Sequence, residues 1–181
     1  MNIKPLIFII LFLSLQCYSQ HSERLINLTS NLKPSDTIHI DLKYSNGNQK
    51  EIGTVYEYEF GDYIYSYYSG KRIEYYRDGS IAVEHKYDDF GILLSCKYYY
   101  GDGNLWFETQ TLKIDSNAID LKSFFEKEKH LTITVKDSDF RYDNVKCDYY
   151  LKKEGQRING KKVGIWKTYN TDGSIKKVSS Y

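Results

Sequence analysis

The sequence predicts an all-β protein, mainly one elongated antiparallel meander sheet of stacked β-hairpins with one short helix inserted. Short apolar–polar alternations of the strand type recur along most of the chain. Pairs of Asn or Asp with Gly separate them, and such a pair between two strand-forming runs is a strong hairpin signal. Gly79 and Gly103 belong to such pairs and Gly91 to a looser copy, and the three glycines follow one another at twelve-residue intervals, as in a meander of short strands.

Residues 1–19 are predicted to be a cleaved signal peptide. Lys4 supplies a charged start, and residues 6–15 form an unbroken apolar run. This run is too short to cross a bilayer comfortably, and the small residues at 17 and 19 predict cleavage between Ser19 and Gln20. Two alternatives stay open: the segment is an uncleaved N-terminal anchor, or Cys17 carries a lipid, as in a bacterial lipoprotein. If the leader is cleaved, the mature chain is expected to associate with a membrane only through a lipid on Cys17.

The chain that follows this leader is formally neutral. Removal of the leader takes away Lys4 and no acidic residue, so the 25 Lys and Arg residues fall to 24, against 24 Asp and Glu residues. A neutral chain lacks the positive surface that nucleic-acid binding requires. We therefore expect an exported protein, periplasmic, on the outer surface or secreted, with no nucleic-acid partner.

The first part of the mature chain divides into two segments. Residues 20–36 have no clear period and are predicted to be a linker or a short helix. Residues 37–112 are expected to form an N-terminal array of hairpins. Its first strand places Ile38, Ile40 and Leu42 on one face, with polar residues between them, which is typical of a half-buried antiparallel strand.

A tyrosine-rich strand in this array offers candidate partner-binding residues. Tyr63, Tyr65 and Tyr67 share one face of it, and Tyr68 lies on the other. One of these rows must belong to the core, but a single-layer sheet exposes the second. Exposed aromatic rows bind glycans, peptides or protein surfaces, so these three tyrosines and Tyr169 are candidates. The alternative is a ladder of tyrosines that only stabilises the sheet.

The strand rhythm breaks over residues 113–130, where a helical insert is predicted. Asn117 is expected to cap a helix over residues 118–129. Ala118, Leu121, Phe124 and Phe125 would form its apolar stripe and pack on one face of the sheet.

Residues 131–181 are expected to continue the same sheet as C-terminal hairpins. Alternation places Cys147 with Val145, Tyr149 and Leu151, and it places Cys96 on an apolar face of an earlier strand. Both cysteines are therefore expected to point at apolar surface, where a free thiol behaves as a small hydrophobe. An oxidising compartment also allows a disulfide between Cys96 and Cys147.

Residues 160–175 follow the pattern Gly-Lys-x-x-Gly-x-Trp-x-x-Tyr-x-x-x-Gly-x-Ile, through Gly160, Gly164, Trp166, Tyr169 and Gly173. This pattern resembles the variant MORN (membrane occupation and recognition nexus) repeat of bacterial proteins, many of which are described as YwqK-like antitoxins. Residues 75–81 and 99–105 keep half of it. The resemblance implies stacked hairpins in one elongated sheet, and it implies little about activity.

No pattern of a catalytic, metal or cofactor site is present. The four histidines are dispersed, and His85 is expected to be a core or rim residue. We therefore expect no cofactor and no metal. The first hypothesis is an exported, non-enzymatic module that binds a protein or a cell-envelope component through one sheet face. The second is an antitoxin or immunity protein against a cognate toxin, which the exported leader does not favour. The third is an enzyme whose site has no recognisable motif.

Overall fold

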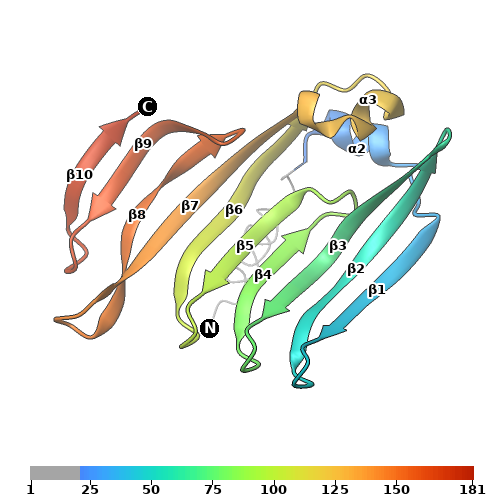
Figure 1. The fold of residues 1–181 in the computed structure, drawn as a ribbon. Coiled ribbons are helices and arrows are strands. Elements are labelled where there is room, and N and C mark those ends of the chain that lie inside the picture. Colours follow the sequence, from blue (N-terminus) through green and yellow to red (C-terminus); the bar gives the residue numbers. More distant parts are fainter. Residues whose placement is uncertain (1–20) are drawn as a thin grey trace, which may run out of the picture.

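The computed structural model describes residues 21–181 and confirms the predicted fold class. Ten strands form one antiparallel sheet whose order in space follows their order in the sequence (Figure 1). The strands are β1 (Asp36–Lys43), β2 (Gln49–Phe60), β3 (Tyr63–Tyr75), β4 (Ile81–Tyr87), β5 (Leu93–Tyr99), β6 (Leu105–Ser116), β7 (Leu131–Asp143), β8 (Asp148–Ile158), β9 (Lys161–Tyr169) and β10 (Ile175–Ser180). The predicted signal peptide, its Ser19–Gln20 cleavage position and Cys17 lie outside the described residues.

Five of the hairpin turns repeat one geometry. In each, a glycine with φ between +74° and +95° donates its backbone N–H to the carbonyl three residues earlier, at Gly47, Gly79, Gly91, Gly103 and Gly173. A shift of strand register accompanies each of these turns, as expected of a turn that ends in a left-handed residue and a bulge. The turn signals in the sequence therefore mark positions where the structure has these turns, each with a glycine of positive φ.

The helical insert is shorter than predicted and is capped by a different residue. Strand β6 continues to Ser116, and the insert holds α3 (Leu121–Phe125) and the 3₁₀ turn η2 (Lys127–Lys129). Asp120, not Asn117, is the N-cap, because its carboxylate and the Ser123 hydroxyl form a reciprocal capping box. The Asn117 side chain instead contacts His130, with Oδ1 and Nδ1 2.9 Å apart.

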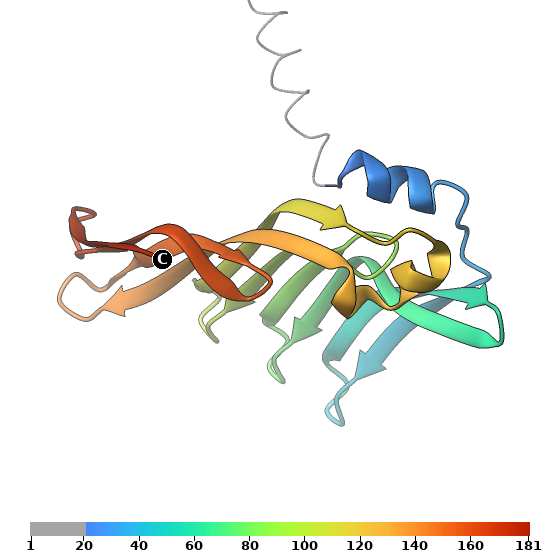
Figure 2. The same cartoon turned by 90° about the horizontal axis from the view of Figure 1, so that it is seen from above.

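The main core lies where the helices meet the sheet. The β4–β5 hairpin is shorter than β3 and β6 beside it, and α3 and the N-terminal helix α2 (Glu23–Thr29) lie at that end of the strands (Figures 1 and 2). The buried side chains there come from both helices, three strands or their turns and the segment before α3: Leu25, Tyr58, Ile92, Ile114, Ala118, Phe124 and Phe125. The helices thus cover an end of the sheet that one hairpin leaves open.

The placement predicted for Cys147 is wrong. Strand β7 ends at Asp143 and β8 begins at Asp148, so Cys147 lies in the turn between them, exposed and with φ +53°. The Asp143 carboxylate accepts a hydrogen bond from the backbone N–H of Val145, and such local bonds favour a turn over a strand. Cys96 is buried as expected. Both thiols are free, so the disulfide considered for this pair does not form.

Candidate ligand-binding groove

The two faces of the central sheet differ in chemistry. Directly paired residues project to the same face, and the strand register places Arg72, His85, Cys96, Thr109, Asp137 and Gly155 in one row across β3 to β8. We call this side the groove face. The opposite side carries ion pairs between neighbouring strands, Lys71–Glu84, Lys97–Glu108 and Lys136–Glu154. The groove face holds a recess lined mainly by apolar side chains.

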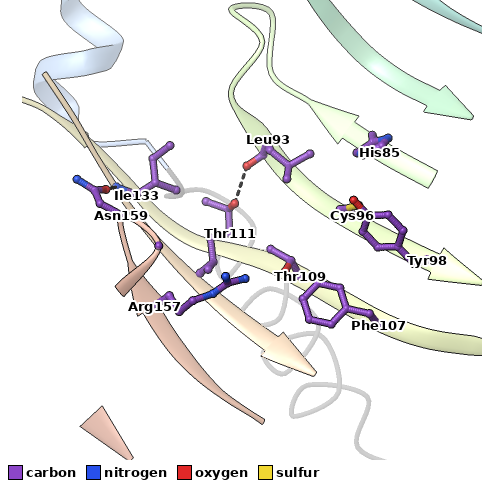
Figure 3. Close-up of a pocket in the computed structure, with 12 residues that line it drawn as sticks. His85, Leu93, Cys96, Tyr98, Phe107, Thr109, Thr111, Ile133, Arg157 and Asn159 are labelled. Atoms are coloured by element: carbon purple, nitrogen blue, oxygen red, sulfur yellow. Dashed lines mark hydrogen bonds between the residues drawn. The ribbon is translucent and has the colours of Figure 1, made fainter. Parts of the chain in front are cut away.

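That recess is a groove of about 410 Å³ between β4 and β8 (Figure 3). Its walls are the apolar or aromatic side chains of Leu93, Tyr98, Phe107, Ile133 and Val135. Its polar lining comes from His85, Cys96, Thr109, Thr111, Arg157, Asn159 and Gly160. An apolar groove of this size with few polar groups is typical of a ligand site.

A charged pair lies at the β7–β8 side of the groove. Asp137 is 4% exposed, accepts a hydrogen bond from the Thr109 hydroxyl at 2.6 Å, and has its other oxygen 2.5 Å from Arg157 Nε. The Nε–H is not aligned for a hydrogen bond, so the contact is ionic. The Arg157 side chain is 33% exposed, and among the described residues its other N–H donors have no hydrogen-bond partner. Asp137 therefore anchors a guanidinium whose outer donors are free to bind a ligand.

His85 and Cys96 lie side by side in the groove lining as a direct cross-strand pair. Burial, and then the positive charge of Arg72, lowers the pKa of His85, and its Nδ1 has no hydrogen-bond partner within the described chain. Burial raises the pKa of Cys96. At neutral pH the two groups are thus a neutral imidazole and a thiol, which is the reverse of the ionised state that activates a cysteine nucleophile.

Three of the four tyrosines considered as partner-binding residues lie in one row on β3, with ring centroids 6.3 Å apart for Tyr63 and Tyr65 and 6.4 Å apart for Tyr65 and Tyr67. Tyr65 stacks on Phe125 of α3 with ring centroids 4.3 Å apart, and the Lys127 ammonium lies 3.0 Å from the Tyr67 ring centroid. Tyr63 is exposed at the end of the same row. Tyr169 lies six strands away in β9 and donates its hydroxyl to Glu154. Tyr65 and Tyr67 thus pack against the helical insert, Tyr63 stays exposed at the end of their row, and Tyr169 is remote from all three.

Trp166 is 6% exposed on the groove face, and Tyr169 lies on the other face, as the spacing predicts. The glycine that makes room for the indole is Gly155 on β8, and not Gly164, which precedes Trp166 by two residues in the sequence. A Cβ on Gly155 would lie 2.2 Å from Trp166 Cδ2, whereas a Cβ on Gly164, which adopts φ +62°, would meet no atom within 4 Å. The indole N–H donates to the Gln156 carbonyl at 3.0 Å. The strongest repeat signal therefore marks a packing contact between β8 and β9.

Comparisons with known proteins place this chain in no family. No protein-family model matches it, and no curated protein matches it. A solved structure that resembles it is the crystal structure, at 1.90 Å resolution, of a protein with unknown function from Bacteroides fragilis NCTC 9343. The match has 13% sequence identity, covers 84% of this chain and 95% of the other, and has a TM-score of 0.21. A TM-score this low supports no conclusion about fold or function.

Residues 21–181 contain neither a cluster of metal ligands nor a membrane-spanning helix. No three His, Cys, Asp or Glu side chains in this range are grouped so that they would hold a metal ion. None of the helices in this range is long and apolar enough to span a membrane.

Sequence reasoning missed the groove residues as a set. His85 lies in β4 and Arg157 in β8, with three strands between them, and neither belongs to a recognisable motif in its own strand. The one available signal was the position of Thr109 and Asp137, polar residues on the apolar-facing side of their strands. A polar residue that alternation places among apolar neighbours is buried only with a partner.

Proposed function

We propose that this chain is an exported, non-enzymatic interaction module that binds a protein or another component of the cell envelope in the groove. The observation that carries the proposal is the groove itself, with apolar walls and the outer donors of Arg157 exposed beside them. A volume of about 410 Å³ is enough for one or two large apolar side chains of a partner. The leader of residues 1–19 supports export.

The chemical state of the groove favours binding over catalysis. Cys96 and His85 are the two groups in it that resemble a nucleophile and a base. The pKa of the Cys96 thiol is raised and that of His85 is lowered, which disfavours the thiolate and imidazolium that such catalysis needs. Apolar walls with a few fixed polar groups instead give affinity and orientation. The immunity role that the repeat resemblance implies stays a prediction, since no feature of the groove favours it.

The test fills the groove and asks whether a partner is lost. The full-length protein, tagged at its C terminus, is recovered from the producing cell with its bound envelope components, which mass spectrometry identifies. Val135→Tyr places a ring in the groove and keeps a residue that suits a strand. Val178→Tyr, on exposed β10, is the matched control.

We expect a component that is recovered with the wild type and with Val178→Tyr to be depleted about tenfold or more with Val135→Tyr. Circular dichroism and the melting temperature show whether both variants are folded. Equal recovery by a folded Val135→Tyr variant would overturn the proposal that the groove is the binding site.

A further inference from the structure

Two lysines lie together beside the groove without an acidic partner. The ammonium groups of Lys153 and Lys162 are 5.1 and 4.8 Å from the centroid of the same Trp166 ring. Their mutual contact is the first cause that lowers the pKa of Lys153, while Asp139 and Tyr181 act in the opposite direction. No carboxylate of the described residues comes within 4.0 Å of either ammonium group, whereas Lys71, Lys97 and Lys136 on the opposite face each pair with a glutamate.

These lysines continue the charge of the groove. Lys162 is the direct cross-strand partner of Arg157, so its side chain projects from the groove face next to the guanidinium. The Asp137 carboxylate already contacts Arg157 Nε, and Asp139 lies 3.3 Å from Arg141 Nε. Three cationic residues thus share the groove face at its β8–β9 side, and the two acids beside them, Asp137 and Asp139, each contact an arginine.

Holding like charges together costs free energy unless an anion offsets it. The Trp166 ring, fixed on Gly155 and by its bond to Gln156, offsets part of this cost through its π face. The outer donors of Arg157 and both ammonium groups are left to bind a carboxylate. The apolar walls begin beside Arg157, so the anion and an apolar group would belong to one ligand.

We propose that the groove binds an extended acidic segment of a partner protein, with an apolar side chain between Tyr98, Phe107 and Val135 and a carboxylate on Arg157, Lys153 and Lys162. This inference rests on the proposed function and names the chemistry of its partner. Two features favour a peptide as the ligand: the charge complementarity, and the volume of the groove, which holds one or two side chains.

The test compares two peptides that differ only in charge. Acetyl-Leu-Phe-Glu-Glu-amide and acetyl-Leu-Phe-Gln-Gln-amide are titrated into the ¹⁵N-labelled protein, and the indole N–H signals of Trp166 and Trp106 are followed. We expect the acidic peptide to shift the Trp166 signal and to bind about tenfold more tightly than the amide peptide at low salt. The difference should shrink as salt is added, because exposed charges are screened.

Lys162→Gln should weaken binding of the acidic peptide by about three- to tenfold. Lys167→Gln is the matched control, since it lies in the same strand, changes the charge equally and projects from the opposite face beside Glu154. Lys162 is chosen over Arg157 because removing Arg157 would leave the buried Asp137 carboxylate unpaired.

Three other results would overturn this inference. They separate its failure from a failure of the proposed function. If both peptides bind equally and Val135→Tyr weakens both, the groove binds apolar segments but the acidic preference is wrong. If inorganic phosphate alone shifts the Trp166 signal as much as the peptide, the site is a simple anion site. If dodecyl phosphate binds and neither peptide does, the ligand is an amphiphile and not a protein segment.

Discussion

Replacing Gly155 with alanine tests the contact between β8 and β9 most directly. The added Cβ would lie 2.2, 2.4 and 2.5 Å from three atoms of the Trp166 indole, distances that real Cβ atoms do not show. The indole is rigid, so it must move as a whole. Its Nε1–H bond to the Gln156 carbonyl would be strained or lost at the same time.

The magnitude follows from the burial of the ring. Trp166 is 6% exposed, and full exposure of a tryptophan that buries about 150–250 Å² costs about 4–6 kcal/mol. The lost hydrogen bond adds about 1 kcal/mol. A partial displacement should therefore lower the free energy of unfolding by about 2–4 kcal/mol, and the melting temperature by about 5–15 °C.

The assay is a double-mutant cycle by urea denaturation, with Trp166→Ala as the second change. Trp166→Ala alone should cost about 3–5 kcal/mol through lost burial and the cavity left behind. In that background Gly155→Ala should change the free energy of unfolding by less than about 1 kcal/mol, because the clash is gone. Gly101→Ala is the control, since no atom lies within 4 Å of its added Cβ and its φ is not positive.

Two results would refute this role of Gly155. In one, Gly155→Ala destabilises the protein as little as Gly101→Ala; in the other, it costs the same with and without the indole. Either result would mean that Gly155 is needed for its backbone and not for its clearance from Trp166.

Three further predictions concern single residues. Gly173→Val should destabilise the folded protein by about 1–3 kcal/mol, because φ is +84° there and only backbone strain is involved. In urea melts, the control Lys177→Val at an exposed position should be nearly neutral. The reverse ranking would contradict the turn assignment. Burial lowers the pKa of Lys127 to about 7 from 10.5, so between these values the unfolded chain holds a proton that the folded chain lacks. The free energy of unfolding should therefore rise from pH 7 to pH 10 by roughly 2–4 kcal/mol, and an equal rise in Lys127→Met would refute the assignment. A thiol reagent should modify exposed Cys147 at once and buried Cys96 only on unfolding; two fast thiols in the folded protein would contradict this burial.

The structure also changes which substitutions serve as controls. Ser174, next to Gly173, looks from its sequence position like a neutral site. Its hydroxyl and backbone N–H both bond to the Asp172 carboxylate, and the Asn170 amide donates to the hydroxyl. Ser174→Val should therefore also destabilise the turn, by about 1 kcal/mol, which is why Lys177 is the better comparison.

Local chemistry explains why the fold class was predictable. Alternation and Asp-Gly turns act over a few residues, so each hairpin is specified by its own segment. Two local choices were misjudged, and both involve an aspartate. Asp143 closes a turn that alternation reads as strand, and Asp120 caps a helix that propensity starts at Asn117. In both places a side-chain bond to the backbone outweighed the pattern.

The groove was not predictable because it depends on how the registers of successive hairpins add up. Thr109 faces Cys96 and Asp137 only because bulges at Tyr98 and Tyr99, and at Thr111 to Lys113, set the pairing of β6. A slip of one residue in either ladder would send Thr109 to the other face. Bulges depend on backbone conformation at single residues, which the apolar pattern does not report.

The sequential order of the strands has a consequence for how the sheet comes apart. Each hairpin pairs only with its neighbours in the chain, so stability in such an array is close to a sum of local terms. The helices join residues as distant as Leu25 and Ile114 at one part of the sheet, whereas β9 and β10 depend on the neighbouring strand and on one indole seated over Gly155. We therefore expect the last hairpin to open as a separate cooperative unit while the helix-covered strands stay folded. Because Lys162 lies in β9, opening of this unit would also dismantle the cationic side of the groove, and a bound segment would hold the unit closed.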